Sequence, residues 1–98
     1  MFHIYILYSD SSKIYYVGHT NNVERRLEEH NNPIRTTYTS KHLPWKLTCA
    51  FPISDKRFEA IMAEKLIKRR KSRKYIESLC KNELEQLKLK QKVREINS

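Results

Sequence analysis

The hydrophobic pattern of residues 1–18 places the strongest constraint on the fold, because it predicts two antiparallel strands joined by a short turn. Residues 2–8 alternate between two faces: Phe2, Ile4, Ile6 and Tyr8 share one, and His3, Tyr5 and Leu7 share the other. Residues 13–18 form the second predicted strand, and the Ser and Asp residues at 9–12 are typical of a turn. If those four residues are the whole loop, Tyr5 faces Tyr16 and His3 faces Gly18, so two phenols lie side by side.

The next segment predicts a helix that directs one arginine and one histidine toward the sheet. Thr20, Asn21 and Asn22 are candidate N-caps, with Asn21 and Glu24 at capping-box spacing, and the helix is expected to run to about residue 30. At about 100° per residue, one arc of this helix collects Val23, Arg26, Leu27 and His30. The opposite side holds Glu24, Arg25, Glu28 and Glu29, so Arg25 is expected to be solvated.

The rest of the chain predicts a third strand and further helices. A long polar loop at residues 31–44 precedes an alternating strand from Trp45 through Leu47, Cys49 and Phe51, which Pro52 is expected to end. Ser54 or Asp55 caps a second helix, which is expected to be the best-buried helix because apolar side chains cover much of its circumference: Phe58, Ile61, Met62, Leu66 and Ile67. Ser72 and Asn82 are predicted caps of two more helices, the latter with Glu85 at capping-box spacing.

These elements define the fold class. A chain of 98 residues forms one domain with a radius of gyration of roughly 13 Å, which excludes a Rossmann pair, a barrel or a multidomain enzyme. We predict an α/β (α+β) fold in which a small, three-stranded, largely antiparallel sheet is flanked by helices. Residues 1–82 form the domain, and residues 83–98 form a C-terminal helical extension of it.

Charge points to a polyanionic partner. The net charge is +9, and residues 50–98 carry fourteen Lys or Arg against seven Asp or Glu. Seven of the ten residues from 65 to 74 are basic, and that window has no acidic residue, so it favours a phosphate-binding surface over a merely solvated helix face.

The sequence shows no pattern typical of export, of a membrane-spanning segment or of a structural zinc site. No apolar run approaches the roughly 18 residues that span a bilayer, and no cationic segment precedes the first apolar stretch, so we expect a cytoplasmic protein without membrane contact. Cys49 and Cys80 form no CxxC motif, and the four histidines show no structural zinc spacing. We interpret the two cysteines as buried thiols in a reducing compartment.

An ordered set of short motifs resembles a known family. These motifs are HIY at 3–5, YVG at 16–18, VERRLEEH at 23–30, PWKL at 44–47 and EKLIK at 64–68. In this order they resemble a GIY-YIG nuclease domain, in particular the small stand-alone bacterial members related to the N-terminal nuclease domain of the excinuclease that acts in DNA repair. The resemblance covers roughly residues 2–82, and its main departure is His3, where the first motif has glycine.

The resemblance implies a nuclease site built from five side chains. Tyr5 and Tyr16 match the two motif tyrosines, of which the first is assigned to activating water, and Arg26 and His30 complete the catalytic set. Glu64 matches the ligand of one Mg²⁺ or Mn²⁺ ion, with Glu59 as the fallback. A phenol titrates near 10, so Tyr5 needs the metal, Arg26 or His30 to lower that pKa or to relay its proton.

The residues themselves leave structural interpretations open. Glu64 also has the i+4 spacing of a helix-surface ion pair with Lys68, and the tyrosines and His30 could simply pack the sheet. Gly18 fits either a close approach to substrate or a plain turn. The predicted contacts with DNA are Gly18, Lys68, Arg69, Arg70, Lys71, Arg73, Lys74 and Asn82. The resemblance implies that Asn82 lies near the phosphate or the metal.

Three hypotheses for the function follow from these features. The first is a divalent-metal-dependent endonuclease that cleaves DNA during structure- or damage-related processing, with RNA as a further possible substrate and a monomer as the default state. The second is a basic nucleic-acid-binding module that has lost catalysis, which the presence of His3 suggests. The third is a basic protein-interaction module within a repair complex. A metal-dependent nicking assay separates the first two hypotheses.

Overall fold

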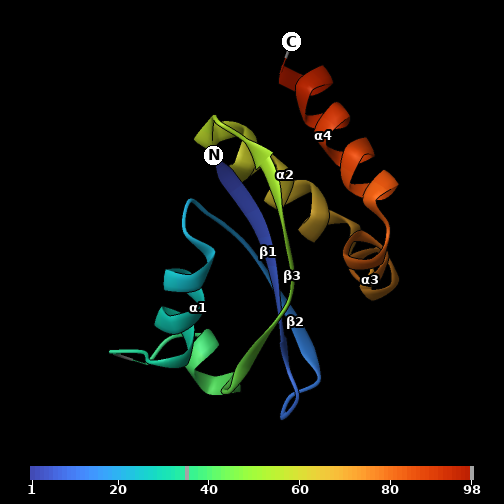
Figure 1. Cartoon of the computed structure of the whole chain (residues 1–98). Helices are drawn as coiled ribbons and strands as arrows, with labels where there is room; N and C mark the ends of the chain where they lie inside the picture. The colour runs from blue at the N-terminus through green and yellow to red at the C-terminus, as the bar shows by residue number, and fades with distance from the viewer. Residues whose placement is uncertain (35, 98) are drawn as a thin grey trace.

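A three-stranded antiparallel sheet with helices on both faces forms the protein (Figure 1). The computed structural model describes residues 1–34 and 36–97. Along the chain the elements are β1 (Phe2–Ser9), β2 (Ile14–Thr20), α1 (Val23–Asn31), a 3-10 turn η1 (Thr39–His42), β3 (Trp45–Ser54), α2 (Arg57–Arg70), α3 (Arg73–Lys81) and α4 (Glu83–Asn97). The α+β class is confirmed, and the radius of gyration is 13.3 Å.

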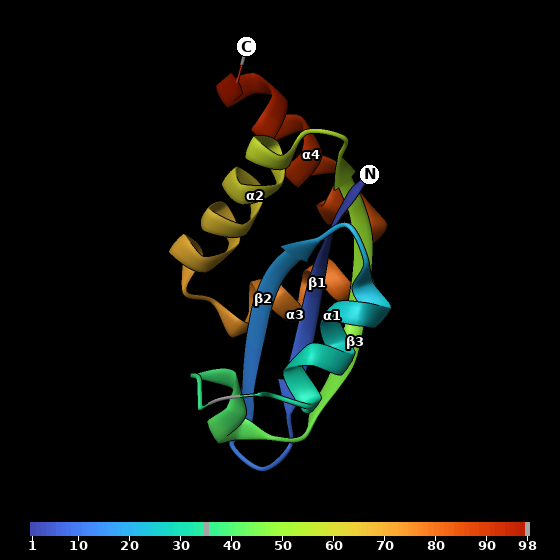
Figure 2. The same cartoon turned by 90° about the vertical axis from the view of Figure 1, so that its left-hand side faces the viewer.

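The sheet separates two apolar clusters, because alternate residues of β1 point to opposite faces. Ile4 and Ile6 pack with Ala60, Leu79 and Val93 of the three C-terminal helices. On the other face, one small cluster is formed by Tyr5, Leu7 and Trp45 with Val23 and Leu27 of α1. Figure 2 shows α1 in front of one face of the sheet, α3 and α4 behind the sheet, and α2 at the side of β2. The predicted alternation of β1 is therefore confirmed.

The register of the hairpin differs from the sequence prediction by two residues. Tyr5 pairs with Gly18, Leu7 pairs with Tyr16, and the strand reaches Ser9. The loop comprises residues 10–13 because Lys13 adopts a left-handed backbone with φ 57°, and its amide donates to the Ser9 carbonyl at 2.7 Å. A shift of two keeps every side chain on its predicted face, so Tyr5 and Tyr16 still share one face.

Strand β3 also departs from the prediction. Pro52 lies inside β3 and does not end it, since β3 is an edge strand in the order β2-β1-β3, where a residue without an amide hydrogen is tolerated. An irregularity opposite Ile6 and Leu7 then shifts the register. As a result, Trp45 packs on the α1 face while Phe51 packs on the opposite face, so the predicted uniform alternation was wrong.

The caps and the buried side of α2 were only partly predicted. Asn22, not Asn21, caps α1 by accepting from the Arg25 amide, and Ser72 caps α3 as predicted. The cap position of α2 is Lys56, one residue after Asp55. The buried residues of α2 are Glu59, Ala60, Ala63 and Ile67, whereas Phe58 is half exposed. Two alanines lie at the centre of this buried stripe, which lets α2 pack closely on the sheet.

The two cysteines are joined. Cys49 of β3 and Cys80 of α3 form a disulfide with a Cα–Cα distance of 5.4 Å, so the prediction of two free thiols was wrong. Sequence spacing did not reveal this pair, because the two positions meet only when α3 packs behind the sheet. Within residues 1–34 and 36–97, no helix is long and apolar enough to cross a membrane.

Candidate active site

A buried hydrogen bond between Tyr5 and His30 lies at the centre of the site. The Tyr5 hydroxyl and His30 Nε2 are 2.9 Å apart, and both side chains are almost fully buried. Burial and the adjacent positive charge of Arg26 lower the pKa of His30 to about 4, so its ring is neutral at pH 7. Burial and the neighbouring Tyr16 raise the pKa of Tyr5 above its ordinary value. At pH 7 the phenol therefore donates to a neutral imidazole.

Glycine is required opposite Tyr5. A Cβ atom at Gly18 would lie 2.4 Å from the Tyr5 hydroxyl oxygen, so any side chain there would displace the phenol. Gly18 is buried inside β2 and has no positive φ, so it is not a turn glycine. This packing explains the glycine without a contact with DNA, which was the predicted role.

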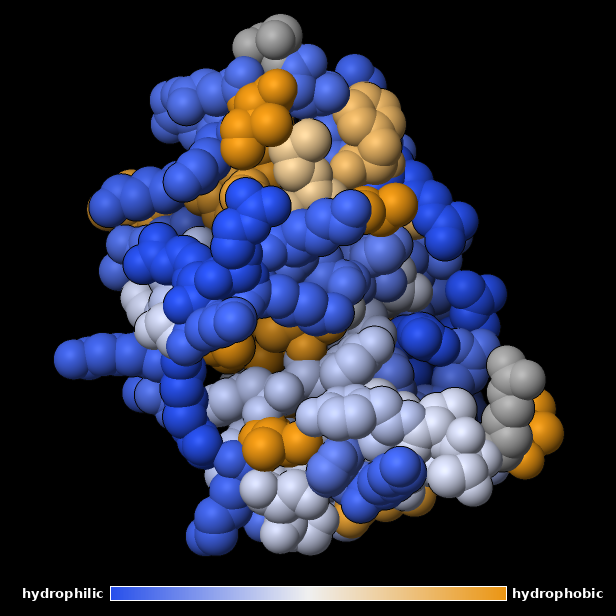
Figure 3. Space-filling view, turned by 180° about the vertical axis from the view of Figure 1, so that it is seen from behind, coloured by the Kyte–Doolittle hydropathy of each residue, from blue (hydrophilic) through white to orange (hydrophobic). Residues whose placement is uncertain are grey.

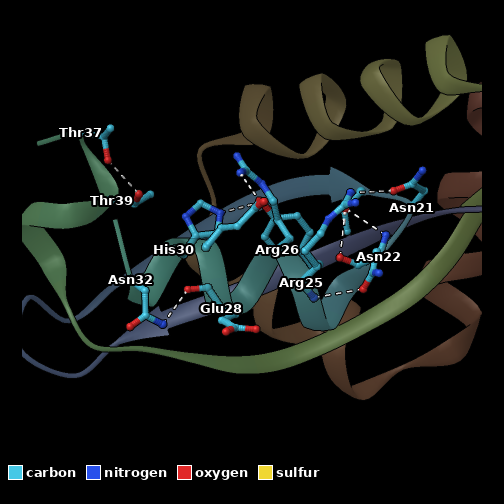
Figure 4. A network of polar contacts seen from close by, with 12 residues as sticks. Asn21, Asn22, Arg25, Arg26, Glu28, His30, Asn32, Thr37 and Thr39 are labelled. Carbon is cyan, nitrogen blue, oxygen red and sulfur yellow. Dashed lines mark hydrogen bonds and ion pairs between the residues drawn. The ribbon is translucent and has the colours of Figure 1, made fainter. Parts of the chain in front are cut away.

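Helix α1 brings Arg26 to the same pair. Arg26 shares the sheet-facing side of α1 with His30, as predicted, and Figure 4 shows the two side chains close together. Burial lowers the pKa of Arg26, but hydrogen bonding to Tyr5 and to Glu29 outweighs that effect and raises it. Glu29 Oε1 accepts from Arg26 Nη1 at 3.1 Å. By contrast, Arg25 is exposed and donates to Asn21 on the outer side of the helix.

Polar anchors hold α1 and the following segment in place. The Asn22 side chain accepts from the Arg25 amide at the start of α1, and Asn32 donates to the Glu28 carbonyl at its end (Figure 4). The Asn31 amide side chain bonds both the nitrogen and the carbonyl oxygen of Trp45, which ties α1 to β3. These contacts fix the position from which His30 reaches Tyr5.

Glu64 reaches the site from α2, past the edge of the sheet. Its two carboxylate oxygens accept from His19 Nδ1 and from Lys68 Nζ, each at 2.7 Å. Burial raises the pKa of Glu64, but the hydrogen bonds from Lys68 and His19 outweigh it, so the pKa is lowered and the carboxylate is ionised at neutral pH. Lys68 Nζ also lies 5.5 Å from the centroid of the Tyr16 ring. Because β2 is an edge strand, α2 can contact residues of both faces there.

The structure thus brings five predicted side chains into one region. Tyr16 completes the set, since its ring centroid is 4.9 Å from that of His30 and 6.3 Å from that of Tyr5. Glu64 is linked to the set through Lys68, which donates to its carboxylate and lies next to the Tyr16 ring. The roles assigned to these five side chains remain predictions.

Other predicted residues lie elsewhere or have structural partners. Glu59, the fallback metal ligand, accepts from Ser54 and from Asn97, and so joins β3 and the end of α4 to α2. Asn82 accepts from the Leu84 amide between α3 and α4, two helices that lie on the face of the sheet opposite α1 (Figure 1). The capping explanation for Asn82 is therefore sufficient. Arg35, a basic residue of the polar loop at 31–44, lies outside the described residues.

The basic run is divided between α2 and α3, and several of its side chains have structural partners. Arg70 stacks on Tyr75, with its guanidinium carbon 3.9 Å from the ring centroid. Arg73 donates to the Lys13 carbonyl at 2.9 Å and to the Tyr8 hydroxyl at 3.2 Å. Lys71 occupies the left-handed position that ends α2. Arg69 and Lys74 are exposed.

His19 is a site residue that sequence reasoning missed. It follows Gly18 and was unassigned because no sequence spacing set it apart from the other histidines. The signal was its parity on β2: side chains next to Gly18 in sequence point to the α2 face, toward Glu64. His3, which replaces the motif glycine, pairs with Thr20 and Pro52 at the start of β1. In the described part of the chain its Nδ1 is buried without a hydrogen-bond partner.

Comparison with known proteins decides the family. The model of the GIY-YIG catalytic domain matches residues 1–76. This chain belongs to the GIY-YIG family. The matched segment contains β1, β2, α1 and α2, and hence all five predicted site residues.

Small bacterial proteins are among its relatives. A UPF0213 protein of Bacillus licheniformis is 45% identical over 65 residues, which are 63% of this chain and 66% of the relative. A UPF0213 protein of Streptococcus pneumoniae is 41% identical over 69 residues, 70% of this chain and 69% of the relative. The UPF0213 protein YsiG of Lactococcus lactis is 38% identical over 88 residues, 84% of each chain. The segment of this GIY-YIG chain that matches the Bacillus licheniformis protein spans just under two thirds of that relative's length.

Glu64 is the carboxylate of this region that could hold a single divalent ion. Within residues 1–34 and 36–97, no group of three or more His, Cys, Asp or Glu could form a metal cage. Mg²⁺, however, usually keeps several waters and binds through one or two carboxylates together with substrate phosphate. Glu64 is an ionised, partly exposed carboxylate of this kind, with side-chain exposure of 21%.

Proposed function

We propose that this protein is an endonuclease that hydrolyses phosphodiester bonds of DNA and uses one divalent ion, Mg²⁺ or Mn²⁺. The buried Tyr5–His30 hydrogen bond beside Arg26 carries this proposal, because it joins a proton donor, a proton acceptor and a fixed cation in one place. Family membership supports nuclease chemistry in general. The net charge of +9 favours a polyanionic substrate.

In this proposal Arg26 binds the phosphate. Attack on phosphorus builds negative charge on the non-bridging oxygens, and a fixed guanidinium near them stabilises the transition state. Arg26 is suited to this role because it lies between Tyr5 and Glu29 and is only partly exposed. When bound at Glu64, a divalent ion supplies further positive charge next to the phosphate.

Tyr5 and His30 move the proton. The attacking water forms the new P–O bond and gives a proton to the Tyr5 oxygen, while the Tyr5 proton passes to His30 Nε2. The bond from phosphorus to the 3′ or 5′ oxygen breaks, and the departing alkoxide takes up a proton from solvent. This relay never needs a free phenolate, which burial of Tyr5 disfavours. The geometry before reaction agrees with it, since the phenol already donates to a neutral ring.

The test is nicking of supercoiled plasmid with Mg²⁺ by the wild type and by Glu64→Gln. We expect Glu64→Gln to abolish cleavage and to leave DNA affinity nearly intact, because the basic surface is unchanged. The matched control is Glu28→Gln, which changes an exposed carboxylate on the outer side of α1 and should cleave like the wild type. Cleavage by Glu64→Gln at the wild-type rate would overturn the metal role, and binding of DNA without cleavage by the wild type would favour an inactive binding module.

A further inference from the structure

A groove of about 380 Å³ lies between α2 and α4, away from the candidate active site. Its floor is apolar and aromatic, with one residue each from α2 and α3 and two from α4: Leu66, Tyr75, Leu89 and Ile96. The candidate active site lies on the α1 face of the sheet, whereas the first three of these residues pack in the cluster on the opposite face. Helix α4 follows the segment that the family model matches, residues 1–76, so the groove is built in part by a helix outside that segment.

Apolar side chains along this groove remain partly exposed. Ile96 is 51% exposed, and Leu66 is half-buried. On α2, the half-exposed Phe58 and the half-buried Met62 precede Leu66 at spacings of four residues, so these side chains follow one side of the helix. Figure 3, which views the molecule from behind, shows apolar side chains near the end of α4 and the start of α2, with hydrophilic side chains beside them. From residue 58 to residue 66 the helix rises by roughly 12 Å, which matches the apolar stripe of a short amphipathic helix.

Positive charge lines the sides of the groove. Its basic lining residues come from the end of α2 and from α4: Arg69, Arg70, Lys88 and Lys92. Glu85 is the acidic one among the described lining residues, and its Oε1 already accepts from Lys88 Nζ at 3.4 Å. Positive charge therefore exceeds negative charge along the groove. A complementary ligand combines negative charge with apolar groups.

These two properties favour a protein helix over DNA as the ligand of this groove. The phosphates of DNA would satisfy the cations but would leave the exposed aliphatic side chains without an apolar partner. An amphipathic helix, by contrast, inserts apolar side chains at i, i+3, i+4 and i+7 into such a groove and keeps its charged residues at the rim. A second copy of this chain is disfavoured, because each copy carries a net charge of +9.

We propose that the groove between α2 and α4 binds an acidic amphipathic helix of a partner protein. The apolar stripe of that helix covers Leu66 and Ile96, and its carboxylates lie near Lys88 and Lys92. This interaction goes beyond the proposed nuclease activity, since none of the five predicted site residues is among the described lining residues of the groove. The partner can therefore bind while the α1 face stays free for a substrate.

Fluorescence anisotropy of a labelled synthetic peptide tests this surface. The peptide is as long as α2, carries leucine at i, i+3, i+4 and i+7 spacings, and carries glutamate on both flanks of that stripe. A scrambled peptide of the same composition lacks the stripe, and a third peptide has lysine in place of each glutamate. We expect the first peptide to bind the wild type with a dissociation constant below about 1 mM, and the other two to bind at least about 10-fold more weakly.

Ile96→Asp and Leu84→Asp form a matched pair on α4. Both replace an exposed aliphatic side chain with a carboxylate, but Leu84 is not among the described lining residues of the groove. We expect Ile96→Asp to weaken binding of the first peptide by about 10-fold or more, because an apolar contact is lost and two negative charges then face each other. Leu84→Asp should bind like the wild type. Lys92→Glu should weaken binding more at low salt than at high salt, since salt screens exposed charges. Circular dichroism checks that each variant is folded.

A failed peptide test is distinguishable from a failed nuclease test, because the readout is binding of a peptide and not cleavage. No binding of the first peptide up to about 1 mM, or equal losses in Leu84→Asp and Ile96→Asp, would overturn the groove proposal and leave the nuclease proposal standing. Equally tight binding of the scrambled peptide would overturn it as well. Weaker binding of duplex DNA by Ile96→Asp than by Leu84→Asp would assign the groove to DNA, and a wild-type dimer that Ile96→Asp dissociates in sedimentation would assign it to a second copy. Either result would overturn the assignment to a partner protein.

Discussion

At the scale of single residues, His30 is a titratable group whose protonation the fold strongly opposes. Burial and Arg26 lower its pKa to about 4, while a histidine in an unfolded chain titrates near 6.5. Between these values the unfolded chain binds more protons than the folded one. The free energy of unfolding should therefore fall as the pH is lowered from about 6.5 to about 4, by about 1 to 3 kcal/mol from this residue.

Urea unfolding of the wild type and of His30→Gln over this range checks the expectation. Glutamine keeps an acceptor for the Tyr5 hydroxyl but does not titrate, so the variant should lose less stability on acidification. The lowered pKa values of Glu59 and Glu64 act in both proteins and cancel in the difference. A difference between the two proteins that stays constant with pH would contradict this account.

Arg26 and Arg25 form a matched pair that tests the orientation of α1. We expect Arg26→Ala to lower the rate of cleavage by about 10²-fold or more, because it removes the cation beside Tyr5. Arg25→Ala removes an exposed side chain that contacts Asn21 and should cost much less. Single-turnover nicking rates at saturating DNA measure both effects. A larger loss of rate in Arg25→Ala than in Arg26→Ala would mean that the side of α1 with Arg25, and not the side with Arg26, faces the phosphate.

Single residues could be predicted from the sequence where the pattern of their near neighbours in the sequence determines their position. The helical period alone placed Arg26 and His30 on the inner arc of α1, and the structure confirms that placement. His19 and Gly18 needed the pairing of strands, because one contacts a residue far along the chain and the other makes room for Tyr5. Neither relation leaves a signal at short sequence spacing.

At the scale of secondary structure elements, the errors arose where backbone irregularities decide the outcome. The left-handed conformation of Lys13 lengthened β1 and moved the hairpin register by two residues. A register irregularity in β3 sent Trp45 and Phe51 to opposite faces. Such features depend on tertiary contacts, whereas the alternation of β1 is a property of its own sequence.

The junction of α2 and α3 gives a prediction about DNA affinity. Arg69, Lys71 and Lys74 are exposed, and Arg70 and Arg73 are exposed as well but also contact tyrosine rings. Replacing the first three residues with Gln should flatten the dependence of log K on log salt by up to about three units for duplex DNA, because each phosphate contact releases counterions. The weakening should be similar for unrelated sequences.

Duplex binding at several salt concentrations, with circular dichroism as the check of folding, measures this effect. Replacing Arg70 and Arg73 in a parallel variant should instead lower the unfolding temperature, since both side chains take part in packing. An unchanged salt slope in the folded triple variant would assign DNA binding to residues 31–44, through Arg35 and Lys41, and not to the end of α2.

At the scale of the whole molecule, the disulfide joins two parts that are far apart in the sequence. Cys49 lies in β3 and Cys80 in α3, with a sequence separation of 31, and α3 and α4 complete the core behind the sheet. Closing a loop of this length restricts the unfolded chain and contributes about 2 to 4 kcal/mol to stability. The proposed active site lies at the β2 edge and on the α1 face, so it does not include this bond.

We therefore expect Cys49→Ser combined with Cys80→Ser to lower the free energy of unfolding by about 2 to 4 kcal/mol while the nicking rate of the folded protein stays near that of the wild type. Urea unfolding with and without reductant provides the measurement. Reductant should destabilise the wild type to the level of the double variant and leave the variant itself unaffected, because only the wild type has a bond to lose. Equal stability of the wild type in both conditions would mean that the two cysteines are thiols in solution, as their sequence spacing alone suggests.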